Sequence, residues 1–92
     1  MADLKKIKEH IRELARRKKN VRLSEIEWVV NNLALNGFES RTAGNEHQKI
    51  FTINKTKFGV CTHHTGSSQL KPEYVKQFVV AMIELGLYDD EN

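Results

Sequence analysis

The sequence predicts a small α+β domain in which helices cover one face of a three-stranded antiparallel sheet. Three observations lead to this prediction: two amphipathic helical patterns open the chain, short segments rich in β-formers fill its middle, and a third amphipathic helix follows. An amphipathic helix and a half-apolar sheet each need a partner to cover their apolar side, so they pack on one another. The 92 residues suit one domain of this kind, with just enough core to fold unaided.

The first expected helix carries most of the basic charge. Its apolar stripe comprises Leu4, Ile7, Ile11 and Leu14. Asp3 is a suitable cap, and the helix should end near Lys19. Residues 1–20 carry a net charge of +5, against −2 for the rest of the chain. This basic arm could attract nucleic acid, or it could be a solvated face whose last cations favour the helix dipole. His10 falls on the polar face and is expected at the surface.

The second expected helix has a clear start and stop. Ser24 and Glu27 have the spacing of a capping box, and Gly37 is placed to end the helix in a left-handed turn. The apolar stripe comprises Ile26, Val29, Val30 and Leu33. Trp28 falls off this stripe, so it could pack on the first helix or lie at a partner surface.

Short segments rich in β-formers follow. Strands are expected at residues 38–43, 47–53 and 57–62, with a turn at 54–57. Alternation along the second strand places His47, Lys49 and Phe51 on one face. We expect this face to be a solvent-facing platform for RNA.

The third expected helix is the clearest element. Pro72 suits its first position, and Gly86 should stop it. Its stripe comprises Val75, Phe78, Val79 and Met82. The acidic residues 89–92 are expected to form a frayed tail.

Composition narrows the class of protein. Cys61 is the single cysteine and cannot form an internal disulfide, which favours a reducing, cytoplasmic location. No apolar run approaches the roughly 18 residues expected of a membrane helix, and no secretory leader pattern opens the chain. A membrane role is therefore not expected.

The most informative motif is the stretch from Gly44 to Phe51, in which a glycine turn delivers His47 and Lys49 onto a strand. RNA cleavage by its own 2′-hydroxyl needs a base to accept that proton and an acid to protonate the departing 5′-oxygen. Histidine titrates near neutrality and can serve in either role, while a lysine two residues on could stabilise charge. The alternative is an exposed strand histidine beside a solubilising lysine.

Several marks of the chain, in this order and spacing, resemble one family. They are residues 19–23 before the second helix, Gly37-Phe38, Gly44 to Phe51, the histidines after the third strand, residues 70–77, and the ending at residues 84–88. With these marks, residues 20–88 resemble the HicA (YcfA-like) mRNA interferase toxins of bacterial toxin-antitoxin systems. Residues 1–19 would then be an amino-terminal extension and residues 89–92 a tail.

The resemblance implies a double-stranded-RNA-binding-domain-like α-β-β-β-α sandwich with an extra amino-terminal helix. It implies a metal-independent endoribonuclease without a cofactor, which cuts mRNA and is silenced by a HicB-like antitoxin. The position that matches the family's catalytic histidine is His47. Because Asn45 and Glu46 both separate it from Gly44, an alignment counted back from the strand would place Gln48 there instead.

Other candidates surround this motif. The resemblance places His63 or His64 near the strand end, where one could assist phosphate binding; each could equally be a loop histidine. Cys61 with these histidines could suggest zinc, but the spacing fits no usual zinc signature, so no metal is expected. Lys71 and Lys76 fall near the start of the last helix and could contact phosphate or simply be solvated.

Two function classes remain after this reading. One is an RNA-cleaving toxin, and the other is a catalytically inactive RNA-binding or protein-interaction module on the same fold. RNA sequence preference, ribosome dependence and oligomeric state lie beyond the sequence.

Overall fold

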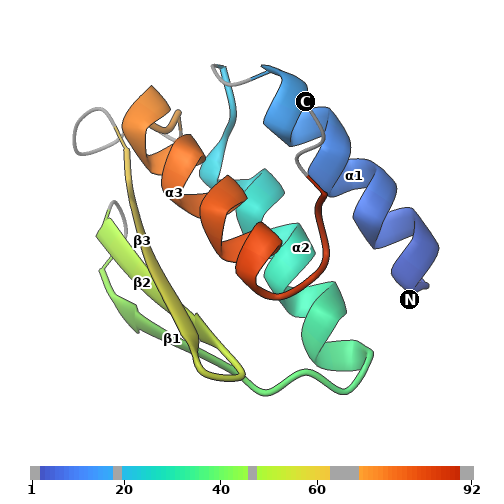
Figure 1. The fold of residues 1–92 in the computed structure, drawn as a ribbon. Helices are drawn as coiled ribbons and strands as arrows, with labels where there is room; N and C mark the ends of the chain where they lie inside the picture. Colours follow the sequence, from blue (N-terminus) through green and yellow to red (C-terminus); the bar gives the residue numbers. More distant parts are fainter. Residues whose placement is uncertain (1–2, 18–19, 46–47, 63–68, 90–92) are drawn as a thin grey trace.

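A computed structural model of the chain describes residues 3–17, 20–45, 48–62 and 69–89. These residues form three helices and one three-stranded antiparallel sheet, which confirms the predicted α+β class and the order of elements (Figure 1). The elements are α1 (Leu4–Arg17), α2 (Leu23–Leu35), β1 (Ser40–Gly44), β2 (Gln48–Ile53), β3 (Thr56–Cys61) and α3 (Pro72–Glu84).

The sheet has β2 in the centre, paired antiparallel with β1 and β3. Asn54 and Lys55 connect β2 to β3, and the positive φ of 55° at Asn54 is a backbone conformation that asparagine tolerates. Register partners in an antiparallel pair have their side chains on the same face. Phe51 therefore shares a face with its partner Phe58, at a ring distance of 5.5 Å, and this face is buried.

The elements form layers. In Figure 1, α2 and α3 lie on one face of the sheet, and α1 lies on the side of these two helices that faces away from it. The α1 side chains Ile7, Ile11 and Leu14 are fully buried and belong to the same hydrophobic cluster as Phe51 and Phe78. The first helix therefore contributes to the one core that these residues share.

The helix starts combine a confirmed and a wrong prediction. The Lys6 backbone N–H donates to Asp3 Oδ1 at 2.9 Å, so Asp3 caps α1 as expected. The expected Ser24 and Glu27 capping box is wrong, because α2 already begins at Leu23. The Arg22 backbone N–H donates instead to the Glu25 carboxylate at 2.9 Å. Burial of Leu23 in the core explains the earlier start.

The helix stops follow the predictions. Gly37 and Gly86 have φ values of 96° and 76°, a conformation that side chains other than glycine rarely adopt. Pro72 is the first residue of α3, where its missing N–H costs nothing.

Trp28 is half-buried against α1, with its ring 4.6 Å from that of His10. His10 is accordingly half-buried, whereas the sequence placed it at the surface.

The connector between α1 and α2 extends the backbone pairing at one end of the sheet. Thr62 and Leu70 form a bridge, the Leu70 N–H donates to the Val21 carbonyl at 2.8 Å, and Arg22 bridges to Gln69. The chain just after β3, just before α3 and just before α2 is thus joined at this end. Among the described helices, none is long and apolar enough to cross a membrane.

Candidate functional site

The turn after β1 requires a glycine. Gly44 has a φ of 105°, and a Cβ atom there would come within 2.2 Å of the Gln48 carbonyl oxygen. The Asn45 N–H donates to this same oxygen at 2.9 Å, and the Gln48 N–H donates to Asn45 Oδ1 at 3.0 Å. This pair of hydrogen bonds fixes where β2 begins.

The three candidate histidines His47, His63 and His64 lie outside the described residues. Their described neighbours nevertheless meet. Gln48, the first residue of β2, is the register partner of Cys61, the last residue of β3. The segment with His47 leads into β2, and the segment with His63 and His64 follows β3, so both adjoin neighbouring strand ends at one end of the sheet. We call this end of the sheet the candidate end.

Lys49 lies on the helix-covered face of the sheet. Its Nζ is 2.6 Å from Glu27 Oε2 on α2, and the two side chains are 25% and 34% exposed. The predicted solvent-facing platform is wrong, because Phe51 on this same face is only 1% exposed. Alternation correctly grouped Lys49 with Phe51, but the helices cover that group.

The Lys49 ammonium remains partly accessible. Its side chain is 25% exposed, and long cationic side chains commonly cover their apolar stem while the charged end stays in water. An ammonium has three donors, of which the Glu27 carboxylate takes one. A partly exposed pair of this kind contributes about 1 kcal/mol or less. A phosphate at the candidate end would have to compete with this carboxylate for the lysine.

Part of the basic arm is also paired. The Arg17 guanidinium lies 2.6 Å from Glu25 Oε1, and the same oxygen accepts the Arg22 backbone N–H. Burial raises the pKa of Glu25. The pKa is nevertheless below its usual value, because the carboxylate accepts the Arg22 backbone bond and the Arg17 side-chain bond and also lies near the charges of Arg17 and His10. Arg17 therefore has a structural role, because its charge stabilises the Glu25 carboxylate.

Lys71 and Lys76 lie at different distances along α3 from the candidate end. The half-buried Lys71 is the N-cap residue, and its backbone N–H donates to the Cys61 carbonyl at 3.3 Å. Lys76 is exposed and lies one turn further along the helix. The structure thus brings Lys71 to the candidate end together with Gln48 and Cys61.

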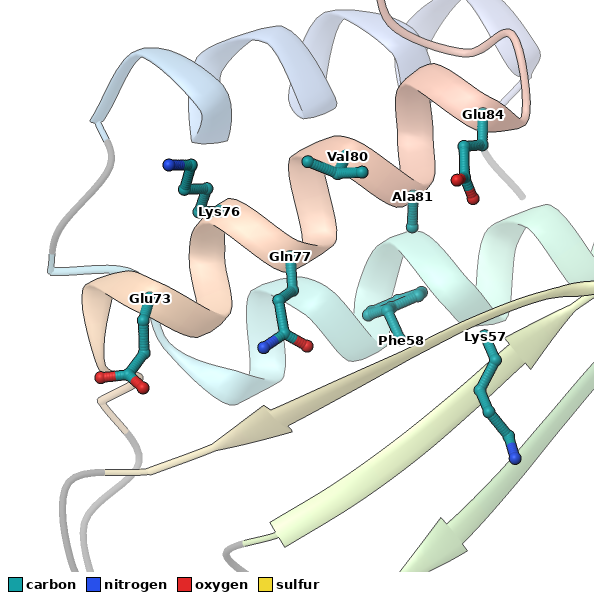
Figure 2. A pocket seen from close by; sticks show the side chains of 8 residues that line it. All are labelled: Lys57, Phe58, Glu73, Lys76, Gln77, Val80, Ala81 and Glu84. Atoms are coloured by element: carbon teal, nitrogen blue, oxygen red, sulfur yellow. The ribbon is translucent and has the colours of Figure 1, made fainter.

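Two hollows flank α3, and neither lies at the candidate end. The first, of about 320 Å³, lies between α3 and β3 and is lined by Glu73 and Glu84 together with Lys57 and Lys76 (Figure 2). The two carboxylates balance the two lysines, so this lining has no net positive charge to favour phosphate. The second, of about 650 Å³, lies between α1 and α3, and exposes the apolar Val80 and Ile83.

Of the side chains considered as zinc ligands, only Cys61 lies within the described residues. No three histidine, cysteine or acidic side chains among them lie close enough to hold an ion. Cys61 is half-buried and carries a free thiol.

Sequence reasoning missed two cations on the sheet. Arg41 and Lys57 both pair in register with Thr52, on the face opposite Phe51. The same alternation rule that grouped Lys49 with Phe51 could have found them, had it been applied to all three strands together.

Comparison with family models, with curated proteins and with solved structures found no match to this chain.

Proposed function

We propose that this protein is a metal-independent endoribonuclease of the HicA (YcfA-like) type that cuts mRNA. The observation that supports the proposal best is the register pair of Gln48 and Cys61. It joins the described neighbours of two histidine-bearing segments, and self-cleavage of RNA needs both a base and an acid. The order α2, β1, β2, β3, α3 is also the order expected of a double-stranded-RNA-binding-like fold.

In the proposed reaction, His47 takes part in proton transfer. A base removes the 2′-hydroxyl proton, the 2′-oxygen attacks the neighbouring phosphorus, and the 5′-oxygen leaves with a proton from an acid. The products are a 2′,3′-cyclic phosphate and a free 5′-hydroxyl. Lys49, which follows Gln48 on β2, and Lys71, whose backbone N–H meets the Cys61 carbonyl, are proposed to stabilise charge at the candidate end, and His63 or His64 is proposed to assist at the phosphate.

The test is cleavage of a long single-stranded RNA in excess chelator by the wild-type protein and its His47→Ala variant. We expect cleavage by the wild type and a loss of at least about 100-fold in the variant. His10→Ala is a matched control, because this histidine packs on Trp28 between α1 and α2. It should keep activity once circular dichroism shows that it is folded. Equal cleavage by wild type and His47→Ala would contradict the proposed role.

The second candidate is a non-catalytic module that binds RNA or a protein partner. The observation that favours it is the ion pair between Lys49 and Glu27. Glu27 neutralises a lysine that the proposed reaction needs to stabilise charge. RNA binding without cleavage by the wild type, under the same conditions, would select this candidate.

The remaining parts of the proposal concern location and partner. We place the protein in the cytoplasm, on the strength of its single, unpaired cysteine.

A HicB-like antitoxin is the proposed protein partner. Co-expression with a small protein encoded next to this one should give a stable complex and suppress cleavage; free, active toxin in that preparation would contradict the partnership.

A further inference from the structure

The sheet has one face that no described helix covers (Figure 1). Register and alternation place eight residues on this face, and we call them the open face: Arg41, Ala43, Gln48, Ile50, Thr52, Lys57, Gly59 and Cys61. Figure 2 shows the two faces directly, since Phe58 points toward α3 while Lys57 points away from the helices.

The eight residues of the open face carry charge of one sign. Arg41 and Lys57 are both exposed, and no carboxylate is among its eight residues. Neither cation forms an ion pair with a described residue, in contrast to Arg17 and Lys49. The nearest acidic residue along β1 is Glu39, which lies two residues before Arg41 and so falls on the same side of the chain at the edge of this face. Lys57 also lines the hollow beside α3 that contains Glu73 and Glu84.

The shape of the open face suits an extended chain. Arg41, Thr52 and Lys57 form one row across the strands, and Ala43, Ile50 and Gly59 form the next. Strands lie about 4.8 Å apart, so the α-carbons of the two cations are about 10 Å apart. The small Ala43 and Gly59 leave a low surface on which Ile50 is 41% exposed.

The open face also leads to the candidate end. Thr52 is four residues from Gln48 along β2, a length of about 13 Å at 3.3 Å per residue. Gln48 and Cys61 form the last row, from which the chain continues to the histidine-bearing segments. A strand held at the two cations would reach this end after a few nucleotides.

We infer that the open face binds single-stranded RNA through the phosphates that Arg41 and Lys57 contact. Protein partners are a poorer fit, because protein interfaces have an apolar, charge-depleted centre and here Ile50 is the one large apolar side chain. The face supplies no aromatic ring, so binding rests on phosphate contacts and should be sequence-tolerant and salt-dependent. The claim that the bound RNA is a substrate rests on the proposed function. The claim that RNA binds to the open face does not.

The test uses a fluorescent 12-nucleotide 2′-O-methyl RNA, which has no free 2′-hydroxyl and cannot be cut by the proposed reaction. Affinity is measured from 50 to 300 mM salt for the wild type and for the double variant Arg41→Ala/Lys57→Ala. Each phosphate contact on a single strand contributes about 0.7 to the slope of log K against log salt. We expect the double variant to lower that slope by about 1.4 and to weaken binding about tenfold at low salt.

The matched control is Lys5→Ala/Lys8→Ala, which removes the same charge from exposed positions on α1. It should leave most of the slope intact. An equal loss in both double variants would show that net charge or the basic arm, and not the open face, governs binding, and it would overturn the inference, as would unchanged binding in the Arg41 and Lys57 variant. A gain-of-function variant adds a separate check: Ile50→Lys should strengthen binding about threefold, and weaker binding would contradict the RNA path.

The inference and the proposed function fail separately. If the wild type binds the uncuttable RNA through Arg41 and Lys57 but cuts no natural RNA, the open face stands and the nuclease falls. If the double variant cuts RNA with an unchanged KM, the nuclease stands and the open face is overturned.

Discussion

The two faces of the sheet use similar residues in opposite ways. On the covered face, Lys49 is held by Glu27 and its neighbour Phe51 is buried in the core. On the open face, Arg41 and Lys57 are exposed and form no ion pair with a described residue, and Ile50 is half-exposed. A cation in a strand is therefore available to a ligand only if its face is open and no carboxylate neutralises it.

The largest expected effect separates Phe51 from Ile50. Phe51→Ala removes a ring that contacts Phe58 in the core and should destabilise the protein by about 3–5 kcal/mol. Ile50→Ala, on the open face, should cost about 0.5–1 kcal/mol, because roughly half of the side chain is already in water. Urea denaturation followed by circular dichroism measures both. Similar losses in the two variants would break the division into covered and open faces.

A second prediction concerns Gly44, which sets which residues lie on which face. A register slip of one residue would exchange the two faces of β2. Gly44→Ala puts a Cβ against the Gln48 carbonyl in a strained backbone conformation, and should cost about 2 kcal/mol or more. Thermal unfolding measures this loss. Gly59→Ala is the control, because a Cβ there has its nearest neighbour at 3.8 Å and no strained φ; equal losses would mean that the turn is not constrained as described.

The sequence predicted much of this arrangement and missed a specific part. Pro72, Gly37 and Gly86 mark helix ends through local backbone chemistry, so they could be identified without knowledge of the fold. Which face of β2 is covered is a tertiary property. Both faces carry an apolar residue, and the carboxylate that pairs with Lys49 belongs to Glu27, which lies 22 residues away in the sequence. The same reason hid the position of α1, since periodicity shows that a helix has an apolar side but not what covers it.

A third prediction converts a covered cation into an available one. Glu27→Gln removes the charge that neutralises Lys49, at a stability cost of about 1 kcal/mol or less. Binding of the 2′-O-methyl RNA should strengthen up to about threefold if the candidate end contacts phosphate. The double variant Glu27→Gln/Lys49→Met should lose this gain. A gain that persists without Lys49 would show that the lysine is not the group that Glu27 restrains.

The smallest effect concerns Glu25, whose carboxylate holds Arg17 much as Glu27 holds Lys49. Its pKa is lowered in the folded protein, so its contribution to stability is fully present above the unfolded value of about 4.5 and is lost as pH falls through the lower folded value. Glu25→Gln should therefore lower the Tm at pH 7 and make less difference at pH 3. Glu13→Gln is the control, because its contact with Arg17 is 3.9 Å long and its side chain is 63% exposed. A Tm difference for Glu25→Gln that stayed constant from pH 7 to pH 3 would mean that the residue acts through packing, and that paired cations on the helices follow a different rule from Lys49.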